Sequence, residues 1–402
     1  MNWDRTNLGE FAPFAYGKSL PKEKRIPGAV SVYGSNGVVG SHDVAFVHGP
    51  SVIIGRKGSV GEVHLSERPS WPIDTAFYAQ GSGNADLYFL YYLLKTLPIT
   101  SNSDSAVPGL NRDFAHSLEF MAPPLATQKA IGLVLRLLDE KISVNNALSK
   151  TLEDIAQTMF KSWFIGFDPV KAKMAGEKPV GMDAETAALF PDSMEESELG
   201  EIPAGWQVGA FERFAQIISG GTPKTSEPSY WEGSIPWFSV TDSPKEGSVF
   251  LMKTAKIISI EGLEHSAANL VRPGVTIISA RGTVGKLAMV STPSTFNQSC
   301  FGVEGRWGDA FNYLLVKSQI SSLQGLSHGG MFDTITRETF KSLFFPFAGE
   351  GIYRAFNRAG GPMFDLIKTL QLENQTLLQV RDLLLPRLVS GELQIPEEML
   401  AS

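Results

Sequence analysis

Two short loops with the same residue pattern carry the clearest potential chemistry in this 402-residue sequence. Lys57–Gly61 and Arg281–Gly285 each read basic residue, Gly, Ser or Thr, Val, Gly. Glycine lets backbone approach a ligand or adopt a positive φ. A cation, a hydroxyl group and backbone N–H groups together suit a phosphate oxygen. The alternative is a tight turn that carries a surface cation. The predicted contact residues are Lys57, Ser59, Arg281 and Thr283, and the neighbouring Arg56 and Lys286 raise the local positive charge.

A second pair of loops offers further contacts of the same kind. The segment Ser219–Lys224 reads SGGTPK and is paralleled by Gly17-Lys18-Ser19. Neither is a Walker A loop, because Ala12 and Ala215 stand where that motif requires glycine. These loops predict contacts to a DNA backbone, and an ordinary solvated turn is the alternative. The predicted contact residues are Lys18, Thr222 and Lys224.

The second half of the sequence contains side-chain amides and aromatic residues, two kinds of group that proteins use to recognise bases. Gln298, next to Asn297, is predicted to read an adenine edge, because a side-chain amide can bond N6 and N7 together. The aromatic residues Tyr230, Trp231 and Trp237 favour core packing instead. His328, within SHGGMF, is interpreted as a loop histidine rather than a catalytic base.

The sequence lacks the familiar catalytic motifs. It has no P-loop, no HExxH, no GxSxG and no [DNS]-P-P-[YFW] motif. Cys300 is the only cysteine, which excludes an internal disulfide and a cysteine-based zinc cluster. A chain of this length without a catalytic constellation favours a binding protein over an enzyme.

These loops belong to an internal duplication. The stretch Val52–Phe77 aligns without a gap on Thr276–Phe301, with eight identities at an offset of 224 residues. The match continues at both ends of each copy. Further equivalent pairs are Trp3/Trp206, Phe11/Phe214 and Arg112/Arg337, and Arg112 and Arg337 are included among the predicted DNA contacts. The sequence therefore predicts a globular unit, a helix, a second unit and a second helix.

The two helices show a seven-residue apolar repeat, which is typical of helices that pack lengthwise on each other. They are predicted from about Gln128 to Phe164 and from about Pro362 to Val389. The alternative is two unrelated amphipathic helices, but their offset of 225 residues argues for duplication. A polar seam residue, here Asn145, costs stability but fixes register. The predicted seam consists of Leu138, Asn145, Leu148, Leu152, Ile155, Leu366, Leu370, Leu377, Val380 and Leu384.

Composition sets further bounds. The net charge of −7 arises mostly from residues 168–205, which carry three Lys or Arg against nine Asp or Glu, so the remainder is nearly neutral. This acidic stretch is interpreted as an extended connector with one short helix at Asp183–Leu189, or as a partly disordered linker. The sequence contains no run of eighteen apolar residues, so it predicts no membrane span. Its N-terminal residues lack the apolar region of a signal peptide. We therefore expect a cytoplasmic protein.

Four stretches together resemble the specificity (S) subunit of type I restriction–modification systems. They are SGGTPKTSEPSYWEGSIPWFSVTD (Ser219–Asp242), ISARGTVGKL (Ile278–Leu287), TLEDIAQTMFKSWFIGFDPVKAK (Thr151–Lys173) and LLLPRLVSGEL (Leu383–Leu393). Their order and the half-repeat layout extend the resemblance over nearly the whole chain. The first unit departs from it, because that unit lacks a full counterpart of the Gly-Gly-Thr-Pro segment.

The resemblance implies a mixed α/β fold with two target recognition domains, an internal pseudo-two-fold repeat and two long antiparallel coiled-coil helices. Each domain would read one half of an asymmetric double-stranded DNA site. The helices would set the spacing and dock two methyltransferase (M) subunits, and restriction (R) subunits would complete the complex. S-adenosylmethionine, ATP and Mg²⁺ would belong to these partners, with no cofactor in this chain. The implied segments are residues 1–123, the central helix 124–166, the connector 167–204, residues 205–347, and the distal helix with its tail, 348–402.

Three alternatives stay open at the level of sequence. The first is the recognition subunit of a related nuclease–methylase complex. The second is a DNA-modifying enzyme with an unrecognised site, and the third is a coiled-coil adaptor that does not contact DNA. Methyl transfer by the pure chain favours the enzyme. Strong salt-dependent binding to duplex DNA rejects the adaptor.

Overall fold

The computed structural model describes residues 3–81, 83–99, 109–245, 247–327 and 334–399, so His328 lies outside the described residues. The chain divides into two compact units. The first unit joins Met1–Ile142 to Thr376–Ser402, and the second is Ser143–Gln375. Two long helices, α4 (Leu125–Lys161) and α11 (Glu350–Val389), each contribute to both units. The boundary between the units therefore falls inside the helices.

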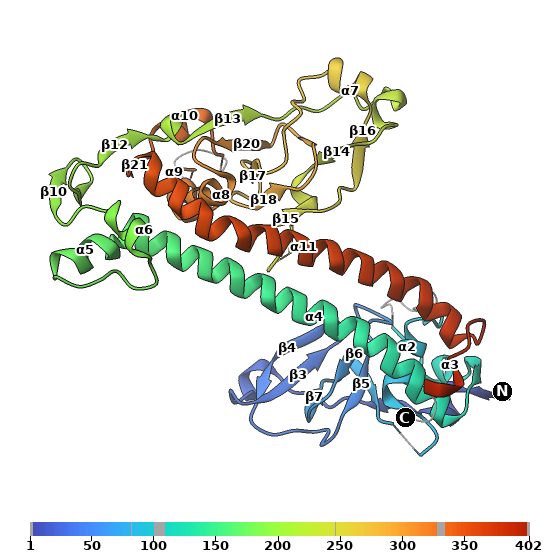
Figure 1. Ribbon diagram of the computed structural model, residues 1–402. Helices are drawn as coiled ribbons and strands as arrows, with labels where there is room; N and C mark the ends of the chain where they lie inside the picture. The colour runs from blue at the N-terminus through green and yellow to red at the C-terminus, as the bar shows by residue number, and fades with distance from the viewer. Residues whose placement is uncertain (1–2, 82, 100–108, 246, 328–333, 400–402) are drawn as a thin grey trace. The chain divides into compact units, whose positions relative to one another are not determined.

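The first unit contains a four-stranded sheet of order β2-β8-β5-β6 and a three-stranded sheet of order β4-β3-β7 (Figure 1). A separate pair, β1 with β9, brings the start of the unit beside the strand that leads into α4. The strands are β1 (Asp4–Asn7), β2 (Ala15–Tyr16), β3 (Val30–Gly34), β4 (Gly37–His42), β5 (Ser51–Gly55), β6 (Val63–Ser66), β7 (Ser70–Pro72), β8 (Ala76–Ala79) and β9 (Glu119–Ala122). The short helices are α1 (Leu8–Phe11), η1 (Lys22–Lys24), α2 (Leu87–Leu94) and α3 (Arg112–His116).

The core of the first unit forms where α2 and the long helices cover the four-stranded sheet. Strand β5 is buried along its whole length, in keeping with its continuous apolar run. The Asp86 carboxylate accepts a hydrogen bond from the N–H of Phe89 at 2.9 Å and caps α2. Ile131 of α4 and Leu388 of α11 are buried in the same core, so the N-terminal part of α4 and the C-terminal part of α11 belong to this unit's interior.

The second unit contains a five-stranded sheet of order β13-β20-β17-β18-β15 and a three-stranded sheet of order β16-β14-β19. The pair β12 and β21 corresponds to β1 and β9 of the first unit. The strands are β12 (Gln207–Ala210), β13 (Ala215–Ser219), β14 (Ile235–Phe238), β15 (Phe250–Leu251), β16 (Lys256–Ile258), β17 (Thr276–Ser279), β18 (Leu287–Val290), β19 (Thr295–Phe296), β20 (Cys300–Gly305) and β21 (Phe344–Phe347). The short helices are η3 (Phe211–Arg213), η4 (Pro228–Trp231), η5 (Val240–Asp242), α7 (Ile260–Glu264), α8 (Asp309–Ser318), α9 (Ile320–Ser327) and α10 (Arg337–Lys341), and η6 (Glu397–Met399) follows α11 near the end of the first unit.

Strand registers confirm the predicted duplication. Ile53 of β5 lies opposite Tyr78 of β8, and Ile277 of β17 lies opposite Gly302 of β20, with both partners displaced by 224 residues. The terminal pairs also match, since β1 meets β9 in the same alignment as β12 meets β21. A one-residue slip would reverse which side chains face the core. The shared register therefore places equivalent residues of the two units in equivalent positions.

The long helices pack antiparallel in each unit, as the resemblance implied. In the first unit, Arg381 of α11 lies 2.7 Å from Asp139 of α4. In the second unit, the Nδ2 of Asn145 donates to the Oδ1 of Asn374 at 2.9 Å, and the Nδ2 of Asn374 donates to Asn146 at 2.8 Å. Partner numbers fall along α11 as they rise along α4. Buried asparagines that satisfy each other hold one register.

The helix α11 begins twelve residues before the predicted start at Pro362. Its first turns bury Tyr353 and Phe356, which are 1% and 0% exposed. Gly360, Gly361 and Pro362 have low helix propensity, but tertiary packing outweighs propensity in proteins. In the described part of the chain, no helix combines the length and the apolar character that crossing a bilayer requires.

The buried face of the helix pair differs in part from the predicted seam. Glu153 of α4 is buried, accepts a hydrogen bond from the hydroxyl of Tyr313 at 2.8 Å and lies 2.6 Å from Lys317. Helix α8 therefore packs on a face of α4, and the seven-residue repeat did not predict that this face is buried. Of the ten predicted seam residues, Asn145 and Leu370 are buried, Leu138, Leu152, Leu377 and Leu384 are partly buried, and Leu148, Ile155, Leu366 and Val380 are exposed.

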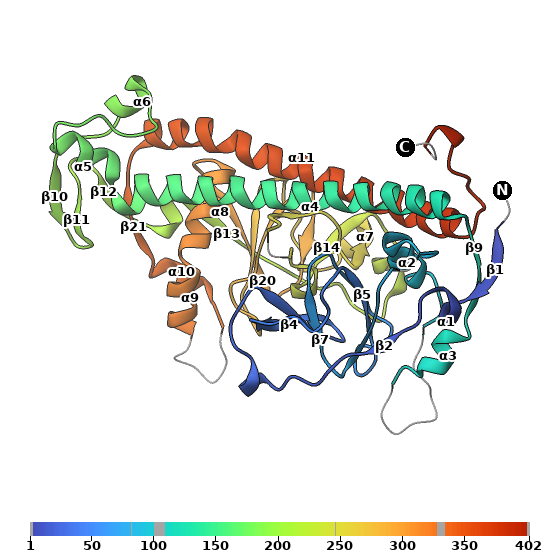
Figure 2. The ribbon, with the colours of Figure 1, turned by 90° about the horizontal axis from the view of Figure 1, so that it is seen from below.

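The acidic connector is a folded part of the second unit. It contains α5 (Asp168–Met174), α6 (Ala184–Ala188) and the hairpin of β10 (Met194–Ser197) with β11 (Gly200–Pro203), which lie beyond the C-terminal end of α4 (Figures 1 and 2). The predicted short helix is confirmed, with the Asp183 side chain as its N-cap. Val170, Phe190 and Ile202 are buried in the main core. These three apolar residues, spaced along an acidic segment, thus hold it against the core. Because they follow no helical or strand period, the sequence pattern did not predict that the segment is folded.

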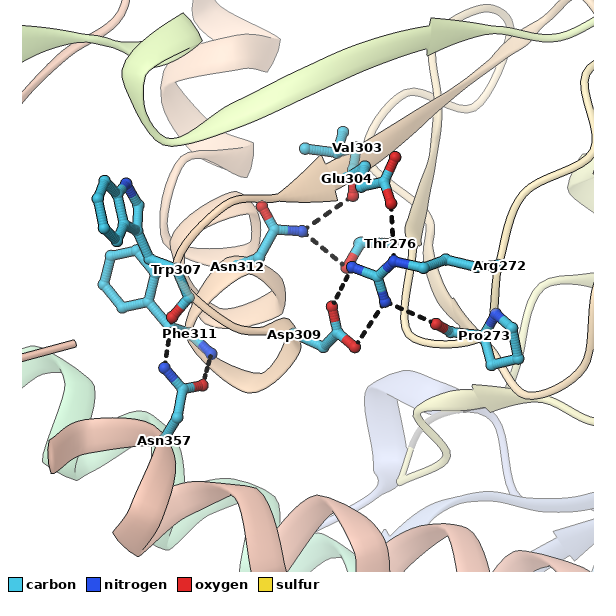
Figure 3. Close-up of polar contacts among 10 residues, drawn as sticks. All are labelled: Arg272, Pro273, Thr276, Val303, Glu304, Trp307, Asp309, Phe311, Asn312 and Asn357. Carbon is cyan, nitrogen blue, oxygen red and sulfur yellow. Dashed lines mark hydrogen bonds and ion pairs between the residues drawn. The ribbon is translucent and has the colours of Figure 1, made fainter. Parts of the chain in front are cut away.

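A polar network in the second unit holds the start of α8 and the end of β20 against α11 and the loop before β17 (Figure 3). Asn357 of α11 donates to the carbonyl of Trp307, and its Oδ1 accepts from the N–H of Phe311 at 3.4 Å. At the first residue of α8, Asp309 pairs with Arg272 at 2.9 Å, and Arg272 also pairs with Glu304 at 2.7 Å. The start of α8 is therefore held both by α11 and by the loop before β17. This anchoring gives the sheet a fixed orientation on the helix within the unit.

Candidate nucleic-acid interface

The two basic loops have the same backbone geometry. They follow the equivalent strands β5 and β17, and Gly58 and Gly282 have φ values of 78° and 75°. A side chain at either glycine would meet open space, so the positive φ is what requires glycine. The N–H of Gly61 donates to Gly55 at 3.0 Å, and the N–H of Gly285 makes the equivalent 3.0 Å bond to Ser279. These two amides are therefore occupied within the loops.

An equivalent chain segment braces each loop from one side. Lys57 forms a bridge with Gly109, and Arg281 forms a bridge with Thr334. The bridges hold the backbone, while the side chains of Lys57 and Arg281 are exposed. Thr283 and Lys286 are also exposed, and Ser59 is half-buried. Each loop thus presents a cation and a hydroxyl group from a rigid turn, so the turn alternative and the phosphate interpretation are compatible.

The predicted pair Arg112 and Arg337 lies beside these loops, but the two residues have different partners. Both stand at the first position of a short helix that follows the bracing segment. Arg337 donates from Nη2 to the hydroxyl of Ser219 at 3.0 Å. The Cζ of Arg112 lies 5.0 Å from the ring centre of Tyr16. Tyr16 and Ser219 occupy equivalent strand ends, opposite Phe77 and Phe301 respectively.

The second loop pair crosses the sheet at a point where no side chain fits. A Cβ on Gly17 would lie 2.1 Å from the carbonyl oxygen of Ile73, and one on Gly220 would lie 2.0 Å from that of Asn297. Lys18, next in the chain, places its Nζ 5.7 Å from the ring of Phe46. The glycines therefore fix where the following polar residues emerge.

In the second unit, the structure brings two predicted contact residues together. The hydroxyl of Thr222 donates a hydrogen bond to the Oε1 of Gln298, and the Gln298 side chain is exposed. This contact orients the amide without burying it. Lys224 is also exposed, and its carbonyl accepts from the Nε1 of Trp231 at 3.2 Å. Trp237 is buried and donates from Nε1 to Gly221 at 2.9 Å, in agreement with the packing role expected for it.

A polar groove beside Arg337 exists in the second unit. It has a volume of about 460 Å³ and lies along the edge strand β13, with Arg306, Lys341 and Glu212 among its lining residues. At the position equivalent to Lys341, the first unit has His116, whose Nε2 accepts from the N–H of Phe14 at 2.8 Å. Burial and the nearby Arg112 charge lower the pKa of His116. The first unit therefore lacks the positive charge that Lys341 supplies in the second.

Three further residues lie near these loops, of which the sequence interpretation noted Arg56 only as added charge and missed Tyr16 and Lys256. Arg56 and Tyr16 lie beside Arg112 in the first unit, and Lys256 lies over Trp231 in the second, with its Nζ 5.2 Å from the ring centre. Arg56 had a signal, because it adjoins Lys57. Tyr16 had none, since its partner Arg112 is distant in the sequence. Burial raises the pKa of the Cys300 thiol to about 12, so the only cysteine is unsuited to act as a nucleophile at neutral pH.

Comparison with known proteins gives a consistent result. The profile of the family described as "Type I restriction modification DNA specificity domain" matches residues 1–154 and 203–348. The HindI type I restriction enzyme specificity subunit of Haemophilus influenzae is 29% identical over 338 residues, which cover 73% of each chain. The MjaIX specificity subunit of Methanocaldococcus jannaschii is 24% identical, covering 77% of this chain and 69% of that one.

A solved structure has the same fold. The S subunit of the type I restriction–modification system from M. genitalium superposes with a TM-score of 0.62, at 16% identity, over 97% of this chain and 96% of that one. The profile match falls on the two stretches that contain the duplicated sheets.

Proposed function

Because the chain belongs to the type I restriction modification DNA specificity domain family, we propose that it is the DNA-specificity subunit of a type I restriction–modification complex. Residues 1–123 and 205–347 are its two recognition units. Each reads one half of a bipartite double-stranded DNA site. The observation that supports this proposal most strongly is the repeated loop geometry, which presents a cation and a hydroxyl group at the same place in both units.

Contacts to phosphates and contacts to bases are divided among different residues. Lys57 and Arg281 bind the DNA backbone, because exposed cations on rigid turns suit phosphate oxygens irrespective of sequence. Gln298 reads a base edge in the second half-site. Its Oε1 accepts from Thr222 and retains a second lone pair, and its NH₂ group is available for a base acceptor. Backbone contacts are thus repeated, and base contacts differ.

The long helices set the distance between the half-sites and dock two methyltransferase subunits. Their antiparallel pairing and their buried asparagines favour one fixed register. Exposed apolar residues remain along α4, among them Leu137, Val144 and Ile155, at 52%, 61% and 47% exposure. Such a stripe suits partner helices. Ile155, a predicted seam residue that the structure leaves exposed, thereby gains a role in assembly.

Catalysis belongs to the partner subunits. The methyltransferase subunits hold S-adenosylmethionine, and restriction subunits that join through the complex use ATP and Mg²⁺. This chain supplies recognition without a cofactor of its own, and it works in the cytoplasm, where its DNA and partners are.

The direct test is to co-express the chain with its methyltransferase subunits and to sequence the methylated DNA of the host. We expect one bipartite motif with two specified halves and an unspecified spacer. Methylation of a continuous motif, or none despite a stable complex, would contradict the proposal. A second assay adds S-adenosylmethionine and DNA to the pure chain. Methyl transfer there would favour a DNA-modifying enzyme with an unrecognised site.

A further inference from the structure

Tyr16 lies at the centre of an unusual cluster of charge in the first unit. Its side chain is 48% exposed at the end of β2 and packs at 5.0 Å on the buried ring of Phe77. Two guanidinium groups approach the same ring, since Arg56 Cζ and Arg112 Cζ each lie 5.0 Å from its centre. Arg56 comes from the basic loop and Arg112 from the start of α3. The aromatic ring holds both cations by cation–π attraction.

The two guanidinium groups lack a close carboxylate partner among the described residues. The described hydrogen bond of the Arg56 side chain goes to the carbonyl oxygen of Asp74 at 3.1 Å. Arg112 Nε is 3.8 Å from Asp113, and this buried Nε has no hydrogen-bond partner in the described structure. By contrast, Arg136 in the same unit lies 2.6 Å from Glu140 and 3.3 Å from Glu67. Like charges repel each other, and the exposed Asp113 at 3.8 Å is the one ion-pair partner described for these two groups, so the cluster favours an incoming anion.

The second unit has only part of this arrangement. Ser219, Ala280 and Arg337 occupy the positions of Tyr16, Arg56 and Arg112. One cation remains there, and it already donates to Ser219 at 3.0 Å. The paired guanidinium groups are therefore a property of the first unit rather than of the shared scaffold.

We propose that Tyr16, Arg56 and Arg112 form a seat for one phosphate of the DNA strand that the first recognition unit contacts. The inference rests on the proposed DNA-binding function and deepens it. Guanidinium groups bind phosphate through paired hydrogen bonds, and two of them lie within 5.0 Å of the Tyr16 ring centre. Lys57, on the same loop, contacts a neighbouring phosphate.

The test uses the full chain with its methyltransferase subunits and a 40-base-pair duplex that carries its methylation motif. Binding is measured at several salt concentrations for the wild type and for the double variant Arg56→Ala/Arg112→Ala. Each phosphate contact contributes about 0.9 to the slope of log affinity against log salt. We expect the double variant to lose about 0.9 from that slope, because both residues share one phosphate. A loss of about 1.8 means two separate phosphates and overturns the shared seat, as does an unchanged slope.

A matched control and a second probe keep the outcome clear. Arg68→Ala removes one charge from the opposite end of the β5–β6 hairpin and should leave the slope unchanged. Single neutral methylphosphonates are then placed along the duplex. One position should weaken wild-type binding and have no effect on the conservative double variant Arg56→Gln/Arg112→Gln, and the absence of such a position would reject the seat. Wild type that binds DNA without salt dependence would contradict the proposed function itself, whatever the variants do.

Discussion

The first recognition unit ends its strand β2 with Tyr16, and the second ends the equivalent strand β13 with Ser219. Around these two residues the backbones agree in strand register, in glycine conformation and in the bracing bridges. The side chains that surround these two strand ends differ. One unit gathers two arginines on an aromatic ring, and the other pairs Thr222 with Gln298.

The comparison teaches how a duplicated fold reads an asymmetric site. Residues buried in the sheets keep the same strand register in both units. The exposed residues that follow them can differ between the units without disturbing the sheets. Contacts to phosphates need only a cation at the right place, so either lysine or arginine can make the contact that we propose for Lys57 and Arg281. Contacts to bases need a defined donor and acceptor pattern, so they diverge when the two halves read different sequences.

The largest effect is expected from lengthening the helix pair. Seven residues inserted after Ile142 in α4 and after Gln375 in α11 keep the heptad phase and lengthen both helices by about 10 Å. Each unit keeps its own contacts, since the insertions fall at the boundary between units. Binding at the native spacer should fall on the order of a hundredfold, because one half-site loses its specific contacts.

The readout is binding to duplexes that differ only in spacer length. The doubly lengthened protein should prefer a spacer about three base pairs longer, since B-DNA rises about 3.4 Å per pair. Lengthening α4 alone is the control and should disrupt the paired register. An unchanged spacer preference in the folded double insertion would reduce the helices to a docking surface.

A smaller, half-specific effect is expected at Gln298. Changing Gln298→Ala should lower discrimination at one base pair of the second half-site by about 1–3 kcal/mol. The first half-site should be read as before, because Gln298 belongs to the second unit. Binding to duplexes with every single-base change measures both halves at once. The matched variant Asp74→Ala, at the equivalent position of the first unit, is the control. Equal losses at both halves would refute a base contact.

The repeated cations should give smaller and sequence-independent losses. Lys57→Ala and Arg281→Ala should each weaken binding roughly tenfold, since a hydrogen bond to a charged group contributes about 1.5 kcal/mol or more. Each should also reduce the salt slope by about 0.9. Affinities at four salt concentrations, on specific and random duplexes, provide the measurement. If both variants bind DNA with wild-type affinity and salt slope, the loops are structural turns that do not contact phosphate.

The smallest expected effect concerns His116 and pH. Its Nε2 accepts from the Phe14 N–H, and burial followed by the Arg112 charge lowers its folded-state pKa, although Asp113 acts in the opposite direction. The unfolded chain therefore binds the proton more tightly, so stability is lost as pH falls below about 6.5. Thermal unfolding from pH 7.5 to 5.5 should show a larger decline in wild type than in His116→Gln, whose amide oxygen still accepts. Parallel declines would dismiss the histidine as the cause.

Sequence periodicity predicted the two long helices, and matched motifs predicted the duplication, because both depend on patterns within short segments. The antiparallel pairing was implied by the family resemblance. The start of α11 escaped prediction, since Gly360, Gly361 and Pro362 look like a helix boundary until Tyr353 and Phe356 are seen buried. The exposed positions Leu148 and Ile155 illustrate the same limit. Burial of Glu153 by Tyr313 and Lys317 depends on residues 160 and 164 positions away, which a heptad pattern does not report.

The candidate interface was predictable to a similar extent. The loops and their cations were visible as a repeated motif, and the side-chain roles assigned to them remain predictions. The pairing of Thr222 with Gln298 and the stacking of Arg112 on Tyr16 needed the fold. Each joins segments that only the sheet brings together.

Exchange of one recognition unit tests the central claim most directly. Residues 205–347 are replaced by the equivalent unit of a relative with a different methylation motif, and host DNA is sequenced after co-expression with the methyltransferase subunits. We predict that one half of the bipartite motif changes, while the other half and the spacer length stay the same. A motif altered in both halves, from a chain that still assembles, would contradict two independent units on a shared scaffold.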